Sequence, residues 1–157
     1  MKYYNYDIVF QEIPDETTLA ISISGCPNRC PGCHSPFLWD DTGTELTIQE
    51  YDRLLNTVIA DITCVCFMGG DANSRYINEL AEYTFKNYPF MKIAWYTGNT
   101  VIPSVINLNV FDYIKVGPYV QQRGGLASKN TNQRMYKITH PSRNKNRMND
   151  ITQLFQK

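Results

Sequence analysis

Strand-like and helix-like stretches alternate along this chain, and the alternation limits the folds that it can adopt. Four short runs are apolar or alternate apolar with polar residues, and each is followed within two residues by glycine; they span residues 19–24, 62–68, 92–96 and 111–116. Such runs predict strands. Between the first two, Thr47 and Glu50 form a capping box ahead of apolar residues at helical spacing, which predicts a helix. A second helix is predicted over residues 74–87.

Alternating strands and helices build βαβ units, whose strands pair in parallel. A closed (β/α)₈ barrel needs roughly 250 residues, and this chain has 157. We therefore predict an α/β fold, an open partial (β/α) barrel of mostly parallel strands, with a small doubly wound sheet as the alternative. Residues 1–140 are expected to form this domain. Residues 141–157 are polar and basic before an apolar end, and the sequence leaves open whether this C-terminal tail is loose or a docking helix.

The charge balance and the hydropathy exclude several classes of protein. Lys plus Arg number 15 and Asp plus Glu number 15, so the net charge is zero. A protein held to nucleic acid or to an anionic membrane by bulk electrostatics would carry a positive excess. No apolar run approaches the ~20 residues needed to cross a bilayer, and residues 1–10 lack the features of a secretory signal. We expect a cytoplasmic protein with neither nucleic acid nor membrane as its partner.

Three of the five cysteines lie within eight residues, directly after the first predicted strand. Cys26, Cys30 and Cys33 have the spacing C-x₃-C-x₂-C. The prolines and glycines around them suit a backbone that bends around a central object. An odd number of cysteines clustered in this way is unlike a disulfide framework. The spacing therefore indicates metal or redox chemistry.

Two metal groups are compatible with such a loop. A structural zinc site is closed, with four protein ligands around the ion. The three loop cysteines would therefore need a fourth ligand, which could be His34, Cys64 or Cys66. A 4Fe-4S cluster also takes thiolates, and three of them leave one iron open to bind a small molecule. The spacing favours the cluster and leaves zinc as the alternative. Cys64 and Cys66 share one face of an apolar strand, so we assign them to the core.

The loop resembles the signature of the radical S-adenosylmethionine enzymes, in which three cysteines at this spacing bind a 4Fe-4S cluster whose open iron is chelated by S-adenosylmethionine. Many members carry an aromatic residue where this chain has Gly32. That departure, together with residues 24–26 (SGC) and 30–34 (CPGCH), is similar to one branch: the activating proteins of the anaerobic (class III) ribonucleoside-triphosphate reductase. Residues 95–98 (WYTG) and 132–134 (NQR) also resemble stretches of that branch.

Gly69, Gly70 and Asp71 follow the second predicted strand. Glycines let a backbone approach a ligand without a Cβ, although an ordinary strand-ending turn has the same pattern. The resemblance implies that this stretch holds the amino group of the cofactor's methionine part. In parallel sheets, functional residues gather at the carboxyl ends of the strands. We therefore expect the cysteine loop, this stretch and the residues after the third and fourth strands to share one edge.

The resemblance also implies a ligand set and a reaction. It implies a cluster on Cys26, Cys30 and Cys33, and cofactor contacts at Gly32, Cys33, His34, Gly69, Gly70, Asp71 and Thr97. No catalytic residue is expected beyond the cluster and the cofactor. Reductive cleavage of S-adenosylmethionine would produce a radical that takes a hydrogen atom from a glycine in the large subunit of the reductase. Reduced flavodoxin or ferredoxin is implied as the electron donor.

Two other functions remain open from the sequence. One is a radical S-adenosylmethionine enzyme acting on a small molecule such as a modified purine; residues 132–134 and Gly32 count against it. The other is a non-enzymatic zinc-binding module, which would be colourless and would hold zinc in place of iron. Trp39 lies just after the cysteine loop and is expected to pack over the cluster region.

Overall fold

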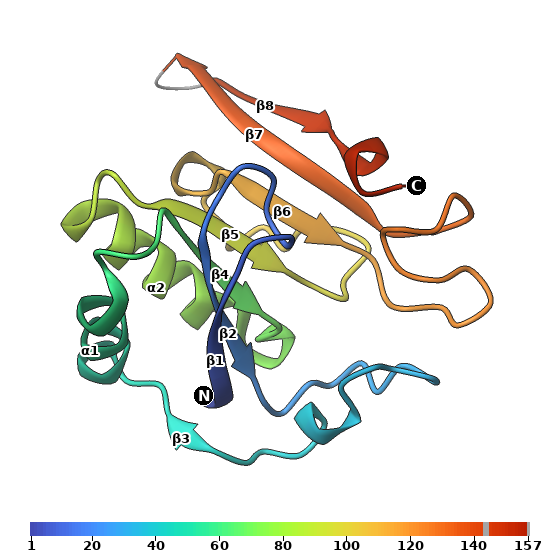
Figure 1. The fold of residues 1–157 in the computed structure, drawn as a ribbon, viewed down its shortest axis with the longest axis horizontal. Coiled ribbons are helices and arrows are strands. Elements are labelled where there is room, and N and C mark those ends of the chain that lie inside the picture. Colours follow the sequence, from blue (N-terminus) through green and yellow to red (C-terminus); the bar gives the residue numbers. More distant parts are fainter. Residues whose placement is uncertain (143–144, 157) are drawn as a thin grey trace.

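The computed structural model describes residues 1–142 and 145–156. These residues form one eight-stranded sheet with the strand order β3-β1-β2-β4-β5-β6-β7-β8, drawn in Figure 1. The strands are β1 (Lys2–Val9), β2 (Thr18–Ile23), β3 (Thr44–Glu45), β4 (Cys64–Met68), β5 (Lys92–Tyr96), β6 (Tyr113–Val116), β7 (Arg134–Ser142) and β8 (Lys145–Asp150). The helices are α1 (Ile48–Val58) and α2 (Ser74–Asn87), with short 3₁₀ helices η1 (Pro36–Leu38), η2 (Asp71–Asn73), η3 (Leu108–Val110) and η4 (Thr152–Phe155).

The sheet is mixed, and the prediction of an open partial (β/α) barrel of mostly parallel strands is wrong. Only the three central pairs, β2–β4, β4–β5 and β5–β6, are parallel. The four outer pairs, β1–β2, β1–β3, β6–β7 and β7–β8, are antiparallel. The described residues contain only two α-helices. Antiparallel neighbours need only a loop between them, whereas parallel neighbours need a crossover connection. The segments that join β1 to β2 and β6 to β7 contain no α-helix.

The individual elements predicted from periodicity are confirmed. The four predicted strands correspond to β2, β4, β5 and β6, and the two predicted helices correspond to α1 and α2. The capping box forms at the start of α1, where the Thr47 side chain accepts a hydrogen bond of 3.1 Å from the Glu50 backbone N–H. Between β5 and β6 the structure has η3 in place of an α-helix. The strands that the sequence analysis missed are the antiparallel ones at the two edges.

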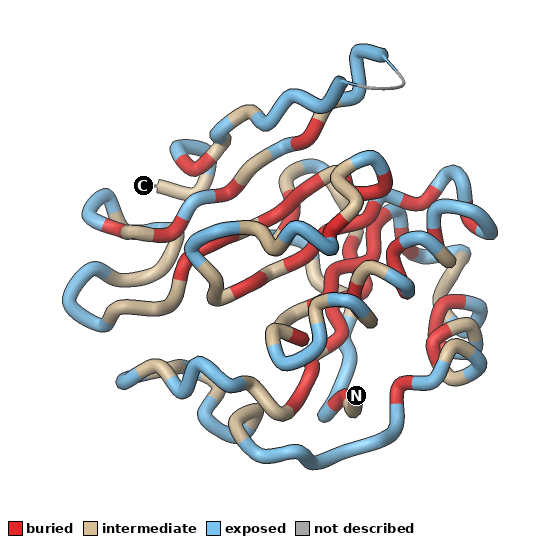
Figure 2. Tube along the Cα trace, turned by 180° about the vertical axis from the view of Figure 1, so that it is seen from behind, coloured by how far each residue is buried: buried red, intermediate tan, exposed pale blue. Residues whose placement is uncertain are grey.

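The main core lies between the sheet and the two helices, which Figure 1 shows on one side of it. Alternate residues of the central strands, such as Val65, Phe67 and Trp95, point to this side and are fully buried. Figure 2 shows the buried positions concentrated along these strands. Since successive side chains of a strand point to opposite faces, the other residues of the central strands lie on the face of the sheet away from the helices.

The second face holds a smaller core that includes Cys64 and Cys66. Both thiols are fully buried on β4 beside Ala94, Tyr113 and Met135, as the sequence analysis expected. Burial raises the pKa of each thiol well above its ordinary value, because desolvation disfavours the thiolate. These two cysteines therefore behave as packing residues at neutral pH.

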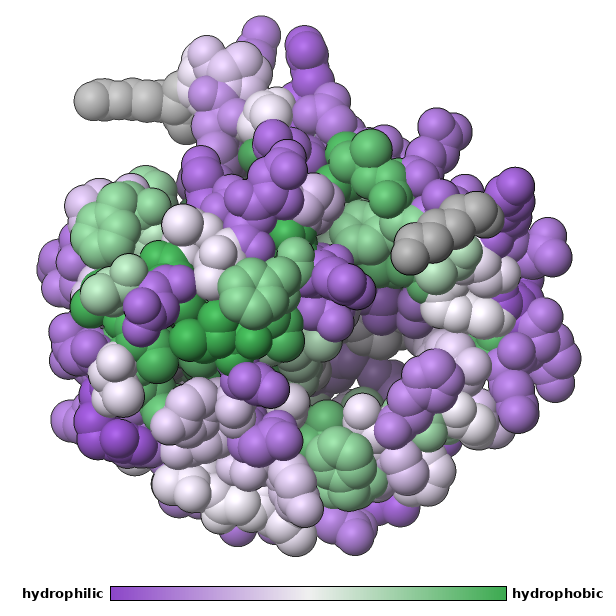
Figure 3. Space-filling view, viewed as in Figure 1, coloured by the Kyte–Doolittle hydropathy of each residue, from purple (hydrophilic) through white to green (hydrophobic). Residues whose placement is uncertain are grey.

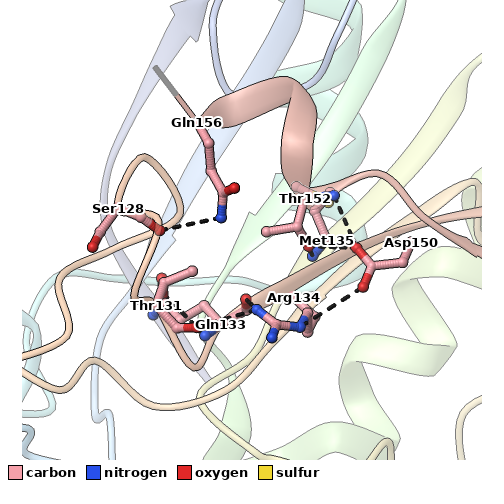
Figure 4. A network of polar contacts seen from close by, with 8 residues as sticks. All are labelled: Ser128, Thr131, Gln133, Arg134, Met135, Asp150, Thr152 and Gln156. Carbon is pink, nitrogen blue, oxygen red and sulfur yellow. Dashed lines mark hydrogen bonds and ion pairs between the residues drawn. The ribbon is translucent and has the colours of Figure 1, made fainter.

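The C-terminal part of the chain is tied to the sheet. The sequence left open a loose tail or a docking helix, and in the structure these residues continue as β8 and η4. Figure 4 shows how the end of β8 is held. Asp150 accepts hydrogen bonds from the backbone and side chain of Thr152, whose hydroxyl oxygen accepts one of 2.9 Å from the Met135 backbone. Arg134 forms an ion pair with Asp150 at 3.7 Å.

No helix among the described residues is both long enough and apolar enough to cross a membrane.

Candidate functional site

The cysteine loop begins where β2 ends, and backbone hydrogen bonds hold its first half. The Gly25 N–H donates to the Asp40 carbonyl at 3.1 Å, and the Cys26 N–H donates to the Leu38 carbonyl at 2.9 Å. Gly25 has a φ of 73°, which favours glycine. These bonds bring the segment that follows η1 back against the start of the loop.

The second half of the loop is a tight turn around Gly32. The Cys33 N–H donates to the Cys30 carbonyl at 3.0 Å, and the Ser35 N–H donates to the Cys33 sulfur at 3.3 Å. Gly32 has a φ of 74°, and a Cβ built there would lie 2.8 Å from the Gln121 side chain. The positive φ favours a glycine in this turn, whereas the flexible end of the exposed Gln121 side chain could move aside.

A pocket of about 220 Å³ lies at the carboxyl ends of β2, β4, β5 and β6. It brings together six of the predicted cluster ligands and cofactor contacts: Cys26, Cys30, Cys33, Gly69, Asp71 and Thr97. Figure 3 shows the surface hollowed between the cysteine loop, at the lower right, and the segment of residues 117–133 above it. The loops that follow β2, β4, β5 and β6 therefore share one edge of the sheet, as expected from the parallel central strands.

Asp71 connects three segments at this edge. Its carboxylate accepts a hydrogen bond of 2.6 Å from the Asn28 side chain in the cysteine loop. It also accepts bonds from the Thr97 hydroxyl at 2.5 Å and the Gly98 backbone N–H at 2.8 Å, both beyond β5. Thr97 is fully buried. The carboxylate thus holds the cysteine loop in a fixed relation to the ends of β4 and β5.

The two glycines before Asp71 have different surroundings. Gly69 lines the pocket, and its carbonyl accepts a hydrogen bond of 2.7 Å from the Trp95 indole. Gly70 is not among the lining residues; a Cβ there would lie 2.5 Å from the Ile77 side chain in the core. Gly70 is the N-cap residue of η2, and its φ of 90° lies in the left-handed region that favours glycine. Gly70 is required by the turn and by packing against α2.

Two other predicted contact residues lie away from this pocket. His34 lines a neighbouring pocket of about 340 Å³, where its ring lies 5.1 Å from that of Tyr119. Cys33 lines both pockets, so His34 lies next to the cysteine site without facing the same hollow. Gly32 lines neither of the two pockets. Its place in the motif is explained by the turn that it makes.

Lys115 is a site residue that the sequence analysis missed. It lies on β6, lines both pockets, and its ammonium lies 5.7 Å from the centre of the Tyr96 ring. Its only protein acceptor within the described ranges is the Gly117 carbonyl, at 3.3 Å, and none of the ion pairs there includes it. Burial lowers the Lys115 pKa, while Asp71 and the cysteines oppose that change. The sequence signal that could have identified Lys115 is a lysine inside the predicted strand of residues 111–116.

The cysteines of the loop are free and half-buried, unlike the two on β4. Over residues 1–142 and 145–156, no three His, Cys, Asp or Glu side chains converge closely enough to hold a single metal ion. The three loop thiols instead line a shared pocket. Their spacing in the sequence is C-x₃-C-x₂-C, but the structure does not draw them together on one point.

The chain belongs to the family of 4Fe-4S single cluster domains. The model of that family matches residues 17–139, from the start of β2 through most of β7. The protein is therefore an iron–sulfur domain, which agrees with the metal chemistry expected from its cysteine spacing. No match was found among curated proteins or among solved structures.

The residues of the pocket suit a 4Fe-4S cluster. Cys26, Cys30 and Cys33 are thiol ligands of the kind that such clusters take. The indole N–H of Trp39, which lines the same pocket, is buried and has no hydrogen-bond partner among the described residues. Lys115 lines the same pocket, where its ammonium group could balance the negative charge of a cluster and its thiolate ligands. The donor set, the free N–H and the nearby cation all fit an anionic, sulfur-rich group.

Proposed function

We propose that this protein is a radical S-adenosylmethionine enzyme that activates anaerobic ribonucleoside-triphosphate reductase by forming a glycyl radical on its large subunit. The observation that carries the proposal is the pocket that joins the cysteine loop to Asp71 and Lys115. A sulfur site beside one carboxylate and one ammonium group suits a cofactor that combines an iron-binding group with an amino acid. S-adenosylmethionine is such a molecule, since its methionine part carries an amino group and a carboxylate.

The charges of the pocket support recognition of that amino acid part. The Asp71 carboxylate already accepts three hydrogen bonds, but an ionised carboxylate has about four lone-pair sites. It can accept one more bond, from the cofactor's amino group. Lys115 has three N–H donors and uses one on the Gly117 carbonyl. The remaining donors can bind the cofactor's carboxylate.

In the proposed site, Cys26, Cys30 and Cys33 hold the 4Fe-4S cluster, which supplies one electron when it is bound. Gly69 presents backbone to the cofactor, and Thr97 orients the Asp71 carboxylate. His34, in the adjacent pocket, is proposed to contact the far side of the bound cofactor. Gly32 and Gly70 act through the shape of their turns.

A protein substrate is favoured by the surroundings of the pocket. The hollow in Figure 3 is open to the surface, and a docked segment of the reductase would close it against water. Tyr4 and Phe37 lie near the cysteine loop with ring centres 4.9 Å apart, and both are exposed. Exposed aromatic rings are enriched in protein–protein contacts. Reduced flavodoxin or ferredoxin is proposed as the electron donor.

The proposal is tested by electron paramagnetic resonance on an anaerobic mixture. The protein with its cluster is combined with a reductant, S-adenosylmethionine and the large subunit of the reductase. A glycyl-radical doublet on the large subunit is expected, and it should be missing when the Asp71→Ala variant replaces the wild type. Cofactor cleavage without a doublet would favour the small-molecule alternative. Bound zinc and no iron in the protein purified without oxygen would favour the zinc module.

A further inference from the structure

Trp39 is held against the cysteine loop by the backbone. Trp39 follows η1, and its backbone N–H donates a hydrogen bond to the Pro36 carbonyl at 3.1 Å. The preceding residue, Leu38, accepts the hydrogen bond from the Cys26 N–H. Trp39 is therefore one residue from a direct backbone link to the first cysteine of the loop.

One face of the Trp39 ring lies near a cation of the cysteine loop. The Arg29 guanidinium lies 5.9 Å from the ring centre, and the same guanidinium pairs with Asp40 at 3.8 Å. A cation over an indole face is attracted by the ring quadrupole. Arg29 itself belongs to the cysteine loop, so the loop contributes a cation to one face of the ring.

The indole N–H of Trp39 is buried and makes no hydrogen bond to any described residue. An unsatisfied buried donor is destabilising, and buried indole N–H groups usually find a partner. The other tryptophan shows the usual arrangement, since the Trp95 N–H donates to the Gly69 carbonyl at 2.7 Å. Trp39 lines the pocket that holds the three loop cysteines. A group bound among these cysteines would therefore lie beside the Trp39 ring.

We propose that the Trp39 indole N–H donates a hydrogen bond to a sulfur atom of the 4Fe-4S cluster and so raises the cluster's reduction potential. Reduction adds negative charge to the sulfurs, and an N–H donor stabilises the more negative state. Trp39 is then a positioning residue that fixes the cluster in the loop and tunes its electron affinity. This inference rests on the iron–sulfur cluster and not on cleavage of S-adenosylmethionine.

The direct test uses wild-type protein containing ¹⁵N-labelled tryptophan. Pulsed electron paramagnetic resonance of the reduced cluster should detect coupling to one ¹⁵N nucleus. That coupling should disappear in Trp39→Phe and persist in Phe37→Leu, which alters a neighbouring exposed ring that has no N–H. A fully loaded wild-type cluster without the ¹⁵N coupling would overturn the inference and leave the proposed function intact. Wild-type protein that binds no iron would overturn both.

The second readout is the reduction potential of the same three proteins at equal iron and sulfide content. Loss of one hydrogen bond to sulfur should lower the equilibrium constant for reduction by about threefold to tenfold in Trp39→Phe, since a net hydrogen bond contributes roughly 0.5–1.5 kcal/mol. Phe37→Leu should match the wild type. An unchanged potential in Trp39→Phe would contradict the inference. Because the ¹⁵N measurement needs only the wild type, poor folding of the variant does not remove the test.

Discussion

The Asn28 side chain donates a hydrogen bond of 2.6 Å to the Asp71 carboxylate, which links the cysteine loop to the end of β4. The two residues are 43 positions apart in the chain. Asn28 lies between the first and second cysteines of the motif, so its position and theirs are coupled. The carboxylate that we propose to recognise the cofactor therefore also positions the cluster ligands.

Removing the Asn28–Asp71 hydrogen bond should loosen the cysteine loop. We expect Asn28→Ala to retain less iron after anaerobic reconstitution and to lose it faster to a chelator. A hydrogen bond to a charged group contributes roughly 1.5–3 kcal/mol, so a double-mutant cycle with Asp71→Ala should show coupling of that order in the stability of the loaded protein. Asn130→Ala, in an exposed loop, is the matched control. Additive effects would mean that the bond does not hold the loop.

The five cysteines should divide into two groups on substitution. Cys26→Ala, Cys30→Ala and Cys33→Ala should each abolish cluster assembly, because a cubane with two protein thiolates has too few anchors. Cys64→Ala and Cys66→Ala should retain iron and lose only packing, about 1 kcal/mol in the free energy of unfolding. Iron analysis of the five variants decides the matter. Loss of iron in a folded Cys64→Ala protein would place that residue among the ligands.

Lys115→Met should weaken the binding of S-adenosylmethionine by about tenfold or more, since a charged hydrogen bond contributes roughly 1.5–3 kcal/mol. Lys115→Arg keeps the charge and should bind with intermediate affinity. The informative comparison is with methylthioadenosine, which lacks the amino acid part and should bind Lys115→Met and wild type equally. Isothermal titration of the loaded proteins under argon gives both affinities. A matched loss for the two ligands would mean that Lys115 shapes the pocket and does not bind the carboxylate.

Glu50 should make stability depend on pH in the acid range. Its carboxylate accepts hydrogen bonds from Arg53 at 2.7 and 2.8 Å and from the Tyr3 hydroxyl at 2.6 Å. The Arg53 bonds, and then the Tyr3 bond, lower the Glu50 pKa to about 2. The unfolded chain therefore binds the proton more readily. The stabilisation is complete above the ordinary glutamate pKa of about 4.5 and is lost as the pH falls toward 2.

Urea unfolding of wild type and Glu50→Gln across this range tests the pH dependence. The two free energies should differ by on the order of 1 kcal/mol at neutral pH, because the pair is partly exposed to solvent, and should converge as the pH approaches 2. Asp61→Asn, at an exposed position, controls for the general effect of removing a carboxylate. A constant difference across the range would show that Glu50 does not contribute through its charge.

Gly70→Ala should destabilise the fold instead of acting only on cofactor binding. The positive φ of Gly70 disfavours a side chain, and the new Cβ would lie 2.5 Å from Ile77 Cδ1. We expect a loss of roughly 1–3 kcal/mol in the free energy of unfolding. Adding Ile77→Val, which removes the nearest atom, should restore part of it. A stable Gly70→Ala protein with weakened cofactor affinity would place Gly70 in the binding surface after all.

The local elements could be predicted because their signals are short in range. The Thr47–Glu50 capping box and the periodicity of the runs after it identify α1, and the four apolar runs identify the parallel strands. The outer strands were not predicted from the sequence, because β1 and β7 are half-exposed and carry many polar residues. Such segments become strands through pairing with a neighbour, which no single run of residues reveals.

The chain sequence alone determined the cysteine spacing, the turns at Gly25 and Gly32, and the helices and central strands, because these depend on neighbours a few residues apart. Only the tertiary structure decided what surrounds the cysteines. It brought Asn28 to Asp71, turned Lys115 inward from β6, and left the Trp39 N–H buried without a partner among the described residues. These relationships join residues that lie far apart in the chain, and they exist only once the strands have paired and the sheet has placed their ends at one edge.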